Sequence, residues 1–149
     1  MKELSPLIKE ALQEGREVII NITGNSMEPL LYEHRDKVSI VKPSDDMLTK
    51  YRIPLYQSSD GVYKLHRIIA VGKQGFVMAG DHQWEKECQI QPSQVYGVVK
   101  GFWRKGNYIS CHKFWYCLYS RLWVGIFPFR RFLIRGAALL HLWRKDYER

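Results

Sequence analysis

Hydrophobic and polar positions along the chain predict one short helix followed by a series of short strands. Apolar residues recur at helical spacing between Ser5-Pro6, a favourable helix start with Ser as the cap, and Gly15, which ends the pattern. The β-branched run 17–22 then predicts a strand that leads the chain to Gly24.

Further strands are predicted wherever apolar, β-branched or aromatic residues recur between turn signals. These segments are 37–41, 53–56, 62–71, 76–79, 95–103 and 108–111. Pro54 favours an edge position for its strand, because proline has no N–H to donate. Ser58-Ser59-Asp60-Gly61 predicts a tight hairpin, whereas 45–52 predicts an irregular or one-turn connection and 82–93 is a polar run.

The last part of the chain differs in kind from this β-rich body. Phe114 to Phe127 is almost continuously apolar and aromatic, Pro128 interrupts it, and apolar residues then recur at helical spacing opposite arginines as far as Trp143 and Arg144. Neither half supplies the ~20 apolar residues that span a bilayer, so the tail either lies in a membrane interface or packs on the body. Both interpretations remain open.

These patterns predict a mainly β fold with a short N-terminal helix and a C-terminal amphipathic helical tail. A length of 149 residues suits a single β domain over 1–112 with the tail, 113–149, as an appendage. The net charge is +8, but 113–149 carries eight positive and two negative groups against fifteen and thirteen in 1–112. This concentration in an aromatic tail favours peripheral contact with an anionic membrane, and no nucleic-acid partner is expected.

The cysteine content predicts neither a disulfide framework nor a metal site. Cys88, Cys111 and Cys117 are odd in number, and the last two, with His112, lack the paired spacing of a structural zinc site. We therefore expect no metal and no cofactor. The N-terminal residues show no signal-peptide pattern, which favours a cytoplasmic protein or one peripheral to a membrane.

Two residues are candidates for nucleophilic chemistry. Ser26 lies between the flexible Gly24 and the turn-fixing Pro29, directly after a predicted strand, although a serine in such a stretch is often only a turn or cap residue. His66 lies on the predicted strand 62–71, where alternation places it on one face with Lys64 and opposite Arg67. An imidazole is suited to accept the proton of a serine hydroxyl at neutral pH.

Taken together and in this order, three motifs resemble those of the S24/S26 serine peptidases, in particular the signal peptidase I-like group whose base is histidine. The motifs are Gly24-x-Ser26-Met27-x-Pro29, His66-Arg67-Ile68 and Gly80-Asp81. The resemblance covers roughly 17–103. It implies a LexA/signal peptidase-like β fold, Ser26 as nucleophile, His66 as base, and an oxyanion hole and substrate contacts around Gly24, Asn25, Met27 and Pro29.

The carboxylate that orients the base is not settled by the resemblance. Asp81 is the favoured candidate and Glu87 the runner-up, with Glu85 also near the expected place; Lys64 is a spare base. The family's Gly-Asp-x-Val motif occurs as Arg35-Asp36-Lys37-Val38, without the glycine.

The function expected from the resemblance is cleavage of a leader or signal segment from a peptide or protein substrate through a Ser-His dyad or triad. Cleavage is expected in trans, because the chain's only Ala-Gly bond, Ala79-Gly80, lies inside the Gly-Asp motif. The alternative is a catalytically inactive peptide- or membrane-binding module on the same fold.

Overall fold

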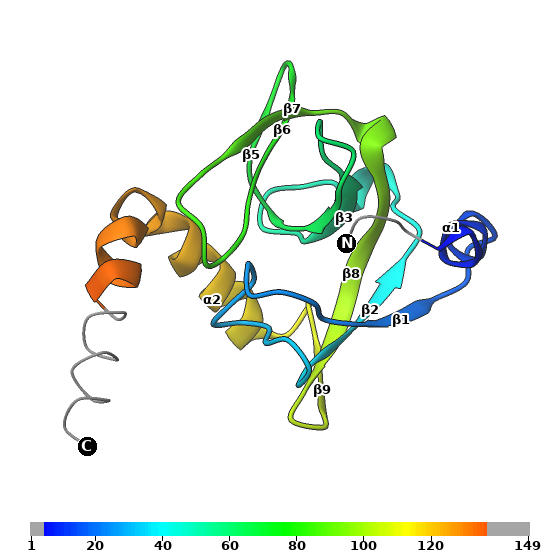
Figure 1. Ribbon diagram of the computed structural model, residues 1–149, viewed down its shortest axis with the longest axis horizontal. Helices are drawn as coiled ribbons and strands as arrows, with labels where there is room; N and C mark the ends of the chain where they lie inside the picture. The colour runs from blue at the N-terminus through cyan, green and yellow to red at the C-terminus, as the bar shows by residue number, and fades with distance from the viewer. Residues whose placement is uncertain (1–4, 137–149) are drawn as a thin grey trace.

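A computed structural model describes residues 5–136 and shows two antiparallel sheets with helices at either side (Figure 1). The larger sheet has the order β1-β2-β8-β3-β4, with β9 paired to β8. Its strands are β1 (Val18–Asn21), β2 (Lys37–Val41), β3 (Pro54–Gln57), β4 (Tyr63–Leu65), β8 (Val95–Arg104) and β9 (Asn107–Ser110). The smaller sheet pairs β5 (Arg67–Gly72), β6 (Gly75–Ala79) and β7 (Glu87–Ile90).

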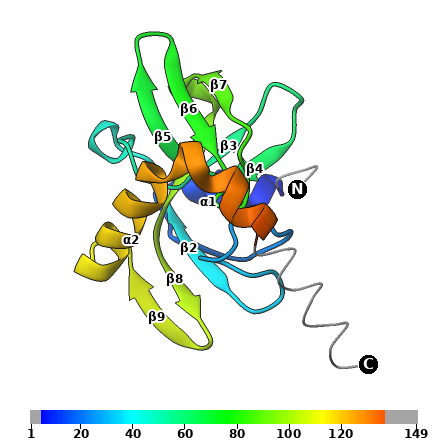
Figure 2. The same cartoon turned by 90° about the vertical axis from the view of Figure 1, so that its left-hand side faces the viewer.

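The helices flank the sheets. Helix α1 (Pro6–Gln13) begins where the sequence predicts, although the Ser5 side chain makes no capping bond and only its carbonyl oxygen accepts from Ile8 and Lys9. Two short 3₁₀ helices, η1 (Asp45–Met47) and η2 (Pro92–Gln94), lie in the connections between strands. At the other end lie α2 (Phe114–Gly125), η3 (Phe127–Phe129) and a helical segment over 130–136, which form one outer layer facing the viewer in Figure 2.

The main hydrophobic core lies between the larger sheet and the segments that cover it. Strand residues Ile40, Leu55 and Phe102 pack there with Leu12 of α1 and Tyr116 of α2, all of them buried. The described part of the tail therefore packs on the body along one face of α2, as one of the two interpretations expected. The predicted mainly β fold with a short N-terminal helix and C-terminal helices is confirmed at this level.

The segment 62–71 is two strands rather than the one predicted. β4 pairs with β3 in the larger sheet, whereas β5 pairs with β6 in the smaller one, and His66 lies at the break between them. No Gly or Pro within 62–71 marks the point where the chain passes from one sheet to the other. His66 is consequently placed where the two sheets meet.

Two other strand predictions need correction. β3 lies between β8 and β4 rather than at an edge; Pro54 is tolerated because β4 pairs only with residues 55–57, so no N–H is required of it on that side. The polar run 82–93 contains β7, which pairs with β6 along the edge of the smaller sheet. Its polar composition concealed it.

Among residues 5–136, no helix combines the length and apolar character needed to cross a membrane. The predicted continuation of the amphipathic tail through Leu140, Trp143 and Arg144 lies outside the part of the chain that the structure describes.

Candidate active site

Ser26 lies in a turn that directly follows β1 and is anchored in the core on its far side. Gly24 has a φ of +77°, a left-handed conformation that favours glycine and turns the chain before Ser26. After Ser26, the buried side chains of Met27, Leu30 and Leu31 join the main core. The half-buried hydroxyl of Ser26 is therefore held between a glycine turn and an apolar anchor.

Ser26 and His66 line the same cleft, although forty residues separate them in sequence. The cleft has a volume of about 100 Å³. Five apolar side chains line it, Ile20, Ile22, Met27, Leu55 and Leu65, together with polar ones that include Asn21 and Thr23. Lys64 also reaches the cleft, as its alternation with His66 predicted. The structure thus brings the predicted nucleophile, base and spare base to one cavity.

The side chain of His66 is almost completely buried, with 4% of its surface exposed, and its Nδ1 atom has two partners. Tyr56 Oη of β3 lies 3.0 Å from Nδ1, and Glu87 Oε1 of β7 lies 3.3 Å from it. A proton on Nδ1, directed at the carboxylate, leaves Nε2 as the basic ring nitrogen. The two partners come from different sheets, so the ring is oriented at the point where the sheets meet.

Glu87 is the centre of a small charged cluster beside His66. Lys64 Nζ lies 3.2 Å from Glu87 Oε1 and 3.3 Å from Asp60 Oδ2. Burial alone would raise the pKa of Glu87, but the hydrogen bonds from His66, Lys64 and Tyr56 outweigh it and hold that pKa below its ordinary value. Burial, and to a smaller extent the negative charge of Glu87, raises the pKa of Tyr56. The Tyr56 hydroxyl therefore stays protonated.

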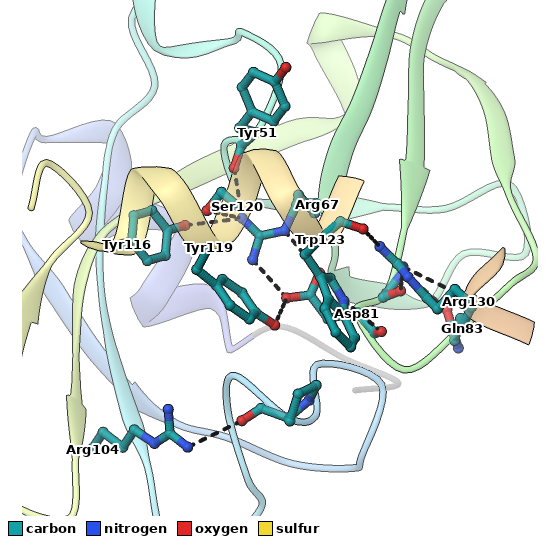
Figure 3. A network of polar contacts seen from close by, with 12 residues as sticks. Tyr51, Arg67, Asp81, Gln83, Arg104, Tyr116, Tyr119, Ser120, Trp123 and Arg130 are labelled. Atoms are coloured by element: carbon teal, nitrogen blue, oxygen red, sulfur yellow. Dashed lines mark hydrogen bonds and ion pairs between the residues drawn. The ribbon is translucent and has the colours of Figure 1, made fainter. Parts of the chain in front are cut away.

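Asp81, the favoured third residue, is engaged elsewhere. Its two carboxylate oxygens accept from Arg67 Nε at 2.8 Å and Nη2 at 2.7 Å, and Tyr119 Oη donates to it at 3.2 Å (Figure 3). Arg67 and Asp81 are both fully buried. The carboxylate that the structure places against the imidazole is the runner-up, Glu87, while Asp81 pairs with Arg67.

The Gly80-Asp81 motif nevertheless contacts the nucleophile segment through the backbone. The N–H of His82 donates to the carbonyl oxygen of Ser26 at 2.8 Å. A Cβ atom on Gly80 would lie 2.5 Å from that same oxygen, so only glycine allows this approach. The motif therefore positions the Ser26 backbone instead of the base.

Arg67 and Arg130 connect the layer formed by α2, η3 and residues 130–136 to the Gly80-Asp81 segment. The sequence predicted a role for neither arginine. Arg67 Nη1 donates to Ser120 Oγ at 2.8 Å, and Arg130 Nη1 donates to the carbonyl oxygen of Gly80 at 2.9 Å. Trp123 Nε1 donates to the carbonyl oxygen of Asp81 at 2.9 Å. Arg130 is fully buried in an arginine-rich segment where exposed charges are the norm, so the sequence carried no signal for it.

The other predicted residues have structural positions. Asn25 is exposed and its carbonyl oxygen accepts from Glu28 N–H, while the Pro29 carbonyl oxygen is 3.5 Å from Arg104 Nη2. Asp36 is buried; burial would raise its pKa, but hydrogen bonds from Arg35 and the Tyr32 N–H lower it. This carboxylate closes the loop that follows Ser26.

None of the three cysteines, all of which the structure describes, lines the cleft of Ser26 and His66. All three are free thiols, and burial raises the pKa of Cys111 to about 11. Within residues 5–136, no group of three or more His, Cys, Asp or Glu side chains is placed to hold a metal ion.

Comparisons of this chain with protein-family models, with curated proteins and with solved structures give no significant match.

Proposed function

We propose that this protein is a serine endopeptidase that removes a leader or signal segment from a peptide substrate in trans. The observation that carries the proposal is that Ser26 and His66 line one cleft and that Glu87 Oε1 lies 3.3 Å from His66 Nδ1. A nucleophile, a base and a carboxylate that orients the base form the arrangement required for acyl transfer from a peptide.

In this mechanism Ser26 Oγ attacks the carbonyl carbon of the scissile peptide bond while His66 Nε2 accepts the hydroxyl proton. His66 then returns that proton to the leaving amine, and water releases the acyl group by the same route. Glu87 stabilises the imidazolium that forms between these two transfers. The backbone N–H of Ser26 is our candidate oxyanion donor, since Gly24 supplies no side chain for the purpose.

The contacts of Lys64 favour His66 as the base. Lys64 Nζ is engaged with two carboxylates, at 3.3 Å from Asp60 and 3.2 Å from Glu87. Lys64 therefore serves as an electrostatic neighbour that moderates the effect of Glu87 on His66.

The substrate class and the finer fold assignment rest on the resemblance of the three motifs to the signal peptidase I-like group. Contacts between these motifs support the proposal: Gly80-Asp81 lies against the Ser26 backbone, and Arg67, next to the base, binds Asp81. We accordingly propose a LexA/signal peptidase-like β fold for residues 17–103.

Labelling with a serine-reactive phosphonate, followed by incubation with a panel of leader peptides, tests this function. We expect the wild-type chain to be labelled and to cleave, Ser26→Ala to lose both properties, and Ser59→Ala, a hairpin serine, to keep both. The loss in turnover should be on the order of 10⁶. Peptide binding without labelling or cleavage by the wild-type chain would favour the inactive binding module.

A further inference from the structure

The outer face of the helical layer carries an unusual share of the exposed apolar surface. The layer consists of α2, η3 and residues 130–136, and both views place it along one side of the molecule (Figures 1 and 2). Six of the eleven large hydrophobic side chains that are exposed within residues 5–136 belong to it. They are Phe114, Trp115, Leu122, Phe129, Phe132 and Leu133.

Helix α2 is apolar on two opposite faces. Its inner face, with Tyr116, Ser120 and Val124, is buried against the body, so this face already has its packing partner. Phe114, Leu118 and Leu122 recur every four residues on the opposite side, where Phe114 is 71% and Leu122 60% exposed. A helix with apolar side chains on two opposite faces is expected to be covered on both.

The charges of the layer indicate what covers the outer face. Residues 113–136 contain five basic groups and no acidic one. One of the five, Arg130, is buried against the body, while Lys113, Arg121, Arg131 and Arg135 are exposed. Aromatic and leucine side chains surrounded by cations are the composition of helices that lie in the headgroup region of an anionic bilayer.

A second copy of the chain fits this surface less well. In a twofold dimer the same patch meets itself, so the exposed cations of one layer would face those of the other without an acidic partner. An anionic headgroup supplies the missing charge.

We propose that the helical layer over 113–136 is a docking surface for anionic phospholipid membranes, with α2 lying parallel to the membrane and Phe114, Trp115 and Leu122 inserted. The inner face of the same layer holds the Gly80-Asp81 segment, whose neighbour His82 hydrogen-bonds Ser26. Docking through the outer face leaves these contacts intact. The proposal does not depend on the catalytic role of Ser26.

Co-sedimentation with phosphatidylcholine vesicles, prepared with and without phosphatidylglycerol, tests the apolar part of the surface. The full chain carries Ser26→Ala throughout, so that the outcome is independent of catalysis. We expect binding to the anionic vesicles and a drop of at least about tenfold in the partition coefficient for Phe114→Ser/Leu122→Ser. The matched control, Leu7→Ser/Val71→Ser, removes exposed apolar side chains elsewhere and should bind as the parent does.

A second pair of variants tests the charge. Each cation near an anionic surface changes the partition coefficient by about fivefold, so Arg121→Gln/Arg131→Gln should lower it by roughly 25-fold. Lys73→Gln/Lys105→Gln removes two exposed charges from turns outside the layer and should have no comparable effect.

Several results would overturn the proposal. Absence of binding to any vesicle, equal binding of the layer variants and the parent, or equal binding to both kinds of vesicle would each do so. A dimer detected by light scattering that Phe114→Ser/Leu122→Ser converts to a monomer, without vesicle binding, would assign the surface to a second copy. Circular dichroism confirms that each variant is folded.

Discussion

Replacing Glu87 by Gln removes the charge that faces His66 and keeps the shape of the side chain. Glu87 Oε1 lies 3.3 Å from His66 Nδ1, so the carboxylate stabilises the imidazolium more than the neutral imidazole. In the proposed mechanism the imidazolium forms as Ser26 gives up its proton, which is a step after substrate binding. We therefore expect the variant to lose kcat, with KM almost unchanged.

The size of the effect follows from the geometry. Two unit charges 3.3 Å apart interact by roughly 5 kcal/mol at an effective dielectric constant of about 20. The Glu87 side chain is 27% exposed, and the Lys64 ammonium lies 3.2 Å from the same oxygen; both weaken the effect on His66. If about half remains, the loss is roughly 2–3 kcal/mol, or about 30- to 160-fold in kcat.

The assay is steady-state cleavage of a leader peptide at neutral pH, with Glu85→Gln as the matched control. Glu85 is an exposed carboxylate two residues away, and its variant should retain wild-type kcat. Full activity of Glu87→Gln, alongside inactive Ser26→Ala and His66→Ala, would refute a role for this carboxylate. It would leave Tyr56 as the partner that orients the imidazole.

Three further predictions follow from the same contacts. Lys64→Gln should change kcat/KM by less than about tenfold, because Lys64 Nζ is engaged with two carboxylates and His66 is the proposed base; a loss as large as that caused by removing the imidazole would contradict this. Asp81→Asn should lower the free energy of unfolding by about 3–5 kcal/mol in urea titrations, since Arg67 stays buried without a counter-charge, whereas Asp60→Asn, on an exposed turn, should lower it by much less. The pKa of Glu87 is lower in the folded chain than in the unfolded chain. The ionised carboxylate therefore stabilises the fold fully above its ordinary pKa of about 4.3, and this contribution is lost as the pH falls through the folded pKa. The difference in free energy of unfolding between the wild type and Glu87→Gln should accordingly become smaller between pH 7 and pH 3.

Much of the fold could be predicted from the pattern of apolar residues, because most strands alternate or bury a β-branched run. The strand predicted over 37–41 is β2, and Asp60-Gly61 forms the predicted hairpin turn. The crossing at His66 could not be predicted, since no Gly or Pro separates the two flanking strands. β7 could not either, because an exposed edge strand is held by backbone hydrogen bonds, which any residue can make.

The candidate site shows the same division. Ser26 and His66 could be proposed from motifs, because each belongs to a short local pattern with a physical purpose. In the structure His66 and Arg67 have different acidic partners, Glu87 and Asp81. The choice between Asp81 and Glu87 required β7, the one strand that the sequence concealed.

The helical layer and the site are one structural unit, and this determines how membrane docking can be tested. Ser120 accepts from Arg67, while Trp123 and Arg130 donate to the Asp81 and Gly80 carbonyl oxygens. A chain truncated after residue 112 would lose all of these contacts and leave a buried ion pair uncovered, so it would lose stability and activity whether or not the layer binds lipid. Only substitutions on the outer face, which touch none of these contacts, can separate docking from catalysis.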